Sequence, residues 1–167
     1  EHFVIPPKFE KAFDFEGEVA RVIAEGKYGL INIQGHYITK PRYTTIEAFN
    51  RHGLAIVSYG KDWTRYGVIN QQGDLITNQS YNEIQAFSEG LAVVKIRENY
   101  GFIDTTGRLL IPADYSKAAA FNEGRAMVQK EGNCGYISRT GDPVIPFQFS
   151  RCLDFQDGKA VVYKGLR

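Results

Sequence analysis

The chain has 167 residues, of which 43% are apolar and 23% are charged, and its formal net charge is +1. This composition is typical of a folded globular chain and excludes a disordered one. The near-neutral charge argues against a dedicated nucleic-acid binder, which normally carries a basic stripe. No apolar run approaches the roughly 18 residues of a membrane span, so we expect no membrane insertion.

Two short features recur along the chain with nearly the same spacing. An acidic-Gly step, or His-Gly in one copy, precedes a strand-like stretch whose alanines are spaced by 34 to 37 residues. An aromatic-Gly-x-Ile step recurs every 34 to 38 residues, with Cys134 replacing the aromatic residue in one copy. A shared period of this length indicates a repeat protein. The alanines are Ala20, Ala55, Ala92, Ala126 and Ala160, and the glycines are Gly29, Gly67, Gly101 and Gly135.

Each unit is predicted to contain three strands in chain order. The first strand begins at the Ala-x-Val stretch, and the second contains the aromatic-Gly step. A four-residue turn follows, with Asn, Asp or Ser first and Gly last, and leads to the third strand through Leu109-Leu110-Ile111 and its equivalents. The turn residues are typical of type I turns, in which the first side chain caps the turn and Gly is left-handed. These turns are 32–35, 70–73, 104–107 and 138–141.

An aromatic residue stands eight positions after each turn glycine, at Tyr43, Tyr81, Tyr115 and Phe149. From there to the next Phe, the larger residues are spaced by three. This spacing fits either a bulged strand or a single helical turn, and both readings stay open.

The small residue in each aromatic-Gly step indicates that something approaches the backbone closely there. Our hypothesis is that a ring from a neighbouring unit covers each glycine. The alternative is that a β-bulge requires the glycine.

The predicted fold class is all-β, with tandem hairpin or meander repeats of about 34 residues. We expect one repeat-array domain over 1–167, because such units bury their apolar faces only against one another. The favoured arrangement is an open curved solenoid or superhelix, and the alternative is a small five-bladed β-propeller. The approximate units are 1–35, 36–73, 74–107, 108–141 and the partial unit 142–167.

The pattern resembles the WG repeat, also called the KWG repeat, of bacterial proteins. The third unit carries it most fully, in Phe87, in Glu89 to Val94, in Tyr100 to Asp104 and Gly107, and in Ile111-Pro112 with Tyr115. This chain has Tyr or Cys where the family name has Trp. The resemblance implies a β-rich repeat region and supplies no catalytic residues.

Recognisable catalytic and cofactor motifs do not occur in the sequence. His2, His36 and His52 lie far apart and lack ligand spacing with the cysteines, so we expect no metal site and no cofactor. Cys134 and Cys152 are expected either as one disulfide or, equally well, as two buried thiols. The recurring acids, Glu16, Glu89, Glu123 and Asp157, are expected to accept hydrogen bonds in turns rather than to act in catalysis.

One hairpin departs from the regular spacing of the repeats. The interval from the Val of the first strand to the next aromatic is nine residues in the second unit and six in the others. The longer segment contains Tyr59, Lys61, Trp63 and Arg65, a composition typical of a binding hot spot. We therefore predict a partner-binding site at these four residues.

The predicted function is a non-enzymatic binding or scaffolding module with a protein or peptide partner. Carbohydrate or cell-wall binding is one alternative, since aromatic residues are abundant. An accessory domain of a larger enzyme is another. No signal-peptide pattern is present at Glu1 to Phe3, and both an exported and a cytoplasmic location stay open.

Overall fold

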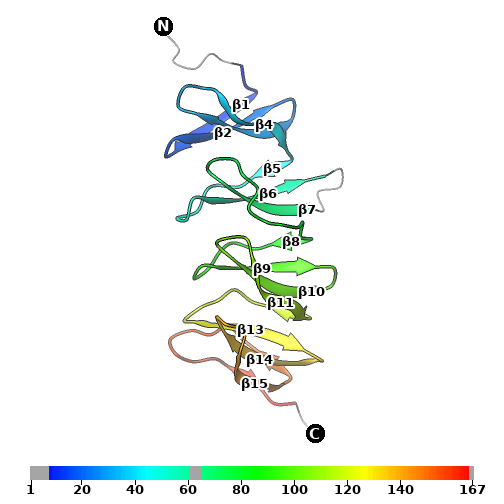
Figure 1. Ribbon diagram of the computed structural model, residues 1–167. Helices are drawn as coiled ribbons and strands as arrows, with labels where there is room; N and C mark the ends of the chain where they lie inside the picture. The colour runs from blue at the N-terminus through cyan, green and yellow to red at the C-terminus, as the bar shows by residue number, and fades with distance from the viewer. Residues whose placement is uncertain (1–7, 61–64, 166–167) are drawn as a thin grey trace. The chain divides into compact units, whose positions relative to one another are not determined.

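A computed structural model describes residues 8–60 and 65–165, and none of these residues lies in a helix. The described residues form small antiparallel sheets joined in chain order, as Figure 1 shows. The all-β repeat prediction is therefore confirmed. The chain divides into two compact units, Glu1–Ser80 and Tyr81–Arg167.

The first unit contains two sheets. The first has the strand order β1-β2-β3-β4, and the second has the order β5-β6-β7. The strands of the first sheet are β1 (Lys11–Glu16), β2 (Val19–Ala24), β3 (Lys27–Asn32) and β4 (Tyr37–Tyr43). Those of the second are β5 (Thr45–Ile46), β6 (Leu54–Tyr59) and β7 (Arg65–Asn70).

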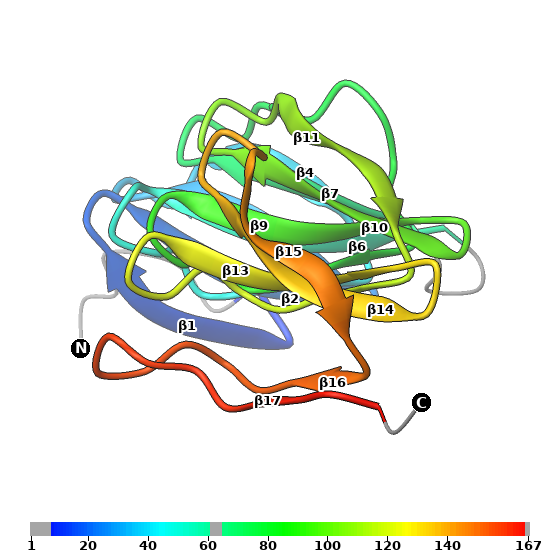
Figure 2. The same cartoon turned by 90° about the horizontal axis from the view of Figure 1, so that it is seen from below.

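The second unit contains two four-stranded sheets and a final pair of short strands. The first sheet holds β8 (Glu83–Ile84), β9 (Leu91–Ile96), β10 (Asn99–Asp104) and β11 (Leu109–Tyr115). The next sheet holds β12 (Lys117–Ala118), β13 (Arg125–Lys130), β14 (Asn133–Ser138) and β15 (Pro143–Phe149). In Figure 2, β16 (Arg151–Cys152) follows the end of β15, and it pairs with β17 (Val162–Tyr163).

Each complete sheet repeats one order of strands. An outer strand pairs with a central hairpin, which contains the first two strands predicted for each unit, and the predicted third strand, seven residues long, pairs with the far side of that hairpin. The hydrogen-bonded sheets therefore span 11–43, 83–115 and 117–149, while the approximate unit boundaries set from sequence fall after the turn glycines. The prediction of one array over 1–167 stays a prediction, as does the choice between a solenoid and a propeller.

The segment between the recurring aromatic residue and the next Phe is extended. It begins with a two-residue strand in β5, β8, β12 and β16. The backbone then makes one more hydrogen bond to the neighbouring strand, as from the Gln85 nitrogen to the Val93 oxygen at 2.9 Å. The segment is thus a short strand followed by chain without regular secondary structure, and the single helical turn is wrong.

The four-residue turns form as predicted. In the first, the Gly35 nitrogen donates to the Asn32 oxygen at 2.9 Å, and Asn32 Oδ1 accepts from the nitrogens of Gln34 and His36. Gly35 has a φ of 77°, in the left-handed region that favours glycine. The corresponding glycines Gly73, Gly107 and Gly141 are left-handed as well.

The hypothesis that a ring from a neighbouring unit covers each aromatic-Gly glycine is wrong. A Cβ built on Gly101 would lie 2.5 Å from the Ile111 carbonyl oxygen and 2.8 Å from the Ala113 nitrogen. Both atoms belong to β11, the last strand of the same sheet. The register of β10 and β11 shifts between Tyr100 and Phe102, so a bulge brings the backbone of β11 over the glycine.

Apolar side chains pack between successive sheets within each unit. In the second unit, Leu91 and Val93 of β9 share one core with Ala126 and Val128 of β13. The same core contains Phe121, whose ring contacts that of Phe102 edge to face, with centroids 5.0 Å apart. Within each unit, a repeat therefore buries its apolar face against the next repeat.

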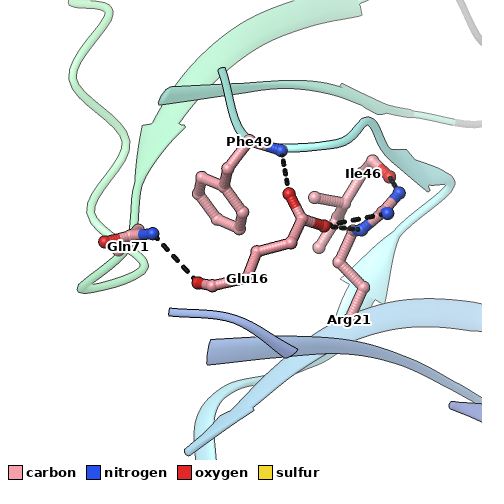
Figure 3. Close-up of polar contacts among 5 residues, drawn as sticks. All are labelled: Glu16, Arg21, Ile46, Phe49 and Gln71. Carbon is pink, nitrogen blue, oxygen red and sulfur yellow. Dashed lines mark hydrogen bonds and ion pairs between the residues drawn. The ribbon is translucent and has the colours of Figure 1, made fainter. Parts of the chain in front are cut away.

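A polar contact joins the two sheets of the first unit at Glu16 (Figure 3). One Glu16 carboxylate oxygen lies 2.9 Å from Arg21 Nη2, and the other accepts from the Phe49 nitrogen at 2.6 Å. Arg21 Nη1 donates to the Ile46 carbonyl, and Gln71 Nε2 donates to the Glu16 carbonyl. The first repeat is thus tied to the second by charged groups as well as by apolar packing.

Cys134 of β14 and Cys152 of β16 form a disulfide with their Cα atoms 6.0 Å apart. Of the two readings left open by the sequence, the structure has the disulfide rather than two reduced thiols. Cys134 is therefore not an available nucleophile. The bond holds β16 against a buried cluster that includes Tyr136.

Candidate functional site

The predicted contact site begins at the base of the β6–β7 hairpin. Tyr59 and Arg65 are directly opposed residues there, the last pair before the connection. The structure brings these two together, whereas Lys61 and Trp63 lie outside the described residues. The other central hairpins are closed by two residues, Glu25-Gly26, Arg97-Glu98 and Glu131-Gly132.

A pocket of about 240 Å³ lies beside this hairpin base. Its lining comes from three elements, namely Arg42 and Tyr43 at the end of β4, Tyr59 at the end of β6, and Leu75 after β7. Tyr43 is buried, Tyr59 is half-buried, and Arg42 and Leu75 are exposed. The pocket therefore combines aromatic and aliphatic walls with a positive charge at its rim.

The two tyrosines and the arginine contact one another directly. The Tyr43 and Tyr59 rings meet edge to face, with centroids 6.3 Å apart. The Arg42 guanidinium carbon lies 4.9 Å from the Tyr43 ring centroid, and Arg42 Nη2 donates to the Tyr43 hydroxyl at 2.8 Å. These contacts link Arg42, Tyr43 and Tyr59 into one wall of the pocket.

The Tyr59 hydroxyl stays protonated to a higher pH than an ordinary tyrosine. Burial raises the pKa of Tyr59, and the nearby Tyr43 raises it further. The positive charge of Arg65 and a hydrogen bond with Ser80 oppose this rise. Arg65 therefore lies close enough to Tyr59 for its charge to affect the pKa of the hydroxyl, although it does not itself line the pocket.

The second repeat differs from the others in a way that explains the pocket. Its third strand is reduced to one bridge, between Ile69 and Leu75. A Cβ on Gly67 would meet the Leu75 and Thr77 side chains, whereas the equivalent Gly101 meets the backbone of β11. The position of Tyr59 is taken by Ala24, Ile96 or Lys130 in the other repeats, so an aromatic wall occurs at this position only in the second repeat.

The unusual hairpin length led to Tyr59 and Arg65, but the sequence analysis missed Arg42, Tyr43 and Leu75 as site residues. Tyr43 had been recognised only as a repeat position. Leu75 occupies an ordinary third-strand position, and nothing in its sequence context marks it as a site residue. Arg42 precedes the recurring aromatic, where the other repeats have Ser80, Asp114 or Gln148, and this change of charge was a usable signal.

Other kinds of site were also sought in the described residues. Over 8–60 and 65–165, no group of three or more His, Cys, Asp or Glu residues is placed to hold a metal ion. His36 and His52 are exposed there. In that same part of the chain, no helix is long and apolar enough to cross a membrane.

Two solved structures are among those that the chain matches. The crystal structure of a eukaryotic initiation factor is 14% identical with a TM-score of 0.50, and the match covers 98% of this chain and 51% of that one. Hsv2 of Kluyveromyces lactis is 13% identical with a TM-score of 0.44, over 87% of this chain and 46% of that one. The chain thus spans about half the length of these proteins. At 14% identity, the similarity to the initiation factor supports the fold alone.

The repeat period found in the sequence agrees with a match to a known protein family. No curated protein is similar enough to the chain to count as a relative. The model of the WG containing repeat, however, matches at residues 1–28, 28–63, 66–100, 100–134 and 135–165. These five matches cover nearly the whole chain and agree with its repeated sheets. The chain therefore belongs to the WG-containing repeat family.

Proposed function

We propose that this repeat module is non-enzymatic and binds a protein or peptide partner at the second repeat. The contact surface consists of Tyr59 and Arg65 together with the adjoining pocket of Arg42, Tyr43 and Leu75. The proposal rests on that pocket. It lies in the second repeat, where a single bridge takes the place of the third strand found in the other repeats. Tyrosine and arginine are also the residues most enriched in binding hot spots.

The recurring acids support a structural rather than a catalytic use of the chain's carboxylates. Glu89 accepts from the Gly124 nitrogen at 2.9 Å, and Glu123 accepts from the Asp157 and Gly158 nitrogens at 2.8 Å. A hydrolase acting on glycosides needs a facing pair of acids with different roles. Carboxylates that each hold the turn of the following repeat are poorly placed for that work.

The proposal can be tested with immobilised peptide and glycan arrays probed with the whole chain. We expect binding to peptides that is lost in Tyr59→Ala and in Arg65→Ala. Lys130→Ala and Asn99→Ala, at the equivalent positions of other hairpins, are the matched controls and should bind normally. Each variant's melting temperature should be checked to show that it is folded.

Two results would contradict the proposal. Binding to glycans alone would favour the carbohydrate alternative. Peptide binding that is equally strong in Tyr59→Ala, Arg65→Ala and the two controls would place the contact elsewhere on the chain.

A further inference from the structure

The residues that line the pocket beside Tyr59 indicate the class of its ligand more closely than the repeat fold does. We infer that it binds an extended acidic peptide, with one apolar side chain of the peptide in the pocket and a neighbouring carboxylate held by Arg42 and Arg65. This inference rests on the proposed function, since it names the partner of the same surface.

The size and lining of the pocket favour a single side chain. Its volume of about 240 Å³ lies below the roughly 300–1,000 Å³ of typical small-molecule sites. The Tyr59 ring and the Leu75 side chain, which is 42% exposed, supply apolar walls. An exposed leucine beside an aromatic ring loses contact with water when an apolar side chain covers it, and that burial favours binding.

The charges at the rim favour a carboxylate. Arg42 and Arg65 are both exposed, and neither forms an ion pair with any carboxylate in the described part of the chain. Arg21 of the same unit is different, because Glu16 neutralises it at 2.9 Å. A guanidinium group presents a planar fork of donors that matches a carboxylate, so Arg42 in the pocket lining, with Arg65 beside it at the hairpin base, favours an acidic ligand.

The geometry also gives the carboxylate a defined place. Arg42 is oriented by its hydrogen bond to the Tyr43 hydroxyl, and Tyr43 forms the wall of the pocket. Arg65 begins β7 directly opposite Tyr59. A peptide side chain that enters beside Tyr59 and Leu75 therefore lies next to Arg42, which lines the same pocket, and Arg65 lies across the hairpin from Tyr59.

The test uses four fluorescent peptides that are blocked at both ends and differ only in a central pair: Leu-Glu, Leu-Gln, Leu-Lys and Ala-Glu. Binding to the whole chain is measured by fluorescence anisotropy at low and high salt. We expect Leu-Glu to bind tightest, about threefold to tenfold better than Leu-Gln, because a surface carboxylate is held by charge-assisted hydrogen bonds. High salt should reduce this advantage.

Variants connect the preference to the residues. Arg42→Gln and Arg65→Gln should each reduce the advantage of Leu-Glu over Leu-Gln, while Arg108→Gln, an exposed arginine of the second unit, should leave it unchanged. Leu75→Ala should weaken the Leu peptides and leave Ala-Glu nearly unaffected.

Two further results separate failure of this inference from failure of the proposed function. If Leu-Glu and Leu-Gln bind equally and Tyr59→Ala weakens both, the pocket is a peptide site but the acidic class is wrong. If no peptide's binding depends on Tyr59, Leu75 or the arginines, both the inference and the proposed function are overturned.

Discussion

The carboxylate oxygen Oε2 of Glu89 accepts a hydrogen bond from the backbone nitrogen of Gly124, which lies one repeat further along the chain, at 2.9 Å. Glu123 repeats the contact with the Asp157 and Gly158 nitrogens. The preceding residue adds a second contact, since Ser88 Oγ donates to the Phe121 carbonyl. Successive repeats of the second unit are thus joined by two parallel polar contacts beside their apolar core. The prediction that the recurring acids accept turn hydrogen bonds is confirmed for Glu89 and Glu123, with the turn supplied by the next repeat, whereas Glu16 accepts from the Phe49 nitrogen and from Arg21.

Replacing Glu89 with Ala should destabilise the second unit by about 1 kcal/mol, the usual net value of one such hydrogen bond. Chemical denaturation of the whole chain measures the change. Arg97→Ala is the matched control, because Arg97 has a similar left-handed backbone (φ 57° against 51° for Glu89) and an exposed side chain. Equal stability losses in the two variants would show that the carboxylate contact contributes nothing.

Replacing Gly101 with Val should lower the melting temperature by several degrees. A Cβ there would lie 2.5 Å from the Ile111 oxygen, so β11 must move away, and overpacking of this kind typically costs about 1–3 kcal/mol. Gly165→Ala is the control, because its Cβ would meet only Ser150 at an ordinary 3.6 Å. Thermal unfolding followed by circular dichroism measures both, and an unchanged melting temperature for Gly101→Val would contradict the close approach of β11.

Features that depend on a few adjacent residues were predictable from the sequence, and features that depend on strand pairing were not. The turn of Asn32 and Gly35 follows from local turn chemistry, so it was predicted correctly. The contact of Gly101 depends on a bulge in β11, which no local pattern specifies. The pocket depends on the rings of Tyr43 and Tyr59 meeting across two sheets, and the hairpin length pointed only to Tyr59.

The disulfide had a signal in the repeat pattern. Cys134 stands at the position of Tyr100, and Cys152 at the position of Ala118. Tyr100 and Ala118 pack against the same buried cluster, so these two positions both face the apolar core of a repeat. Aligning the repeats residue by residue would therefore have favoured the disulfide over two separate thiols.

Asp104 should make the stability of the chain depend on acid pH. Burial tends to raise the pKa of Asp104, but hydrogen bonds from Thr106 and Arg108 outweigh it, and the pKa lies below its ordinary value. A carboxyl with a lowered folded pKa contributes stability above its unfolded pKa, and this stability is lost as pH falls through the folded value. Denaturation at several pH values below about 5 should show this loss.

Asp104→Asn supplies the control, because Asn32 caps the equivalent turn of the first repeat through the same side-chain oxygen. The variant should keep the turn and lose the part of the acid dependence that belongs to Asp104. An identical pH profile for the variant and the original chain would show that this carboxyl does not contribute.

Tyr136 should make the second unit sensitive to alkaline pH. Its ring is buried, and its hydroxyl donates to the Leu153 carbonyl. Burial raises the pKa of Tyr136, and the neighbouring Asp154 raises it further. Stability is therefore full below the ordinary tyrosine pKa of about 10 and falls as pH rises through the folded value.

Tyr136→Phe should remove this alkaline loss and, at neutral pH, cost about 1 kcal/mol for the missing hydrogen bond. Denaturation curves at neutral pH and above pH 10 measure both effects. A variant that loses stability at high pH as steeply as the original chain would assign the alkaline sensitivity to other groups.

The disulfide should control how firmly the final hairpin is held. Cys134 and Cys152 are separated by 18 residues, and closing a loop of this length stabilises a folded chain by about 3 kcal/mol. The short strands β16 and β17 have few hydrogen bonds of their own, so the loss should be concentrated there. We expect the double variant Cys134→Ala/Cys152→Ala to exchange backbone hydrogens much faster over 150–165 and to keep the protection of β9, β10 and β13.

Alkylation provides an independent measurement on the original chain. After refolding in an oxidising glutathione buffer and denaturation without a reductant, no thiol should react, and two should react once a reductant is added. Two reactive thiols without the reductant would contradict the disulfide. Unchanged exchange over 150–165 in the double variant would show instead that apolar packing around Tyr136 alone holds the hairpin, because those contacts survive when the bond is removed.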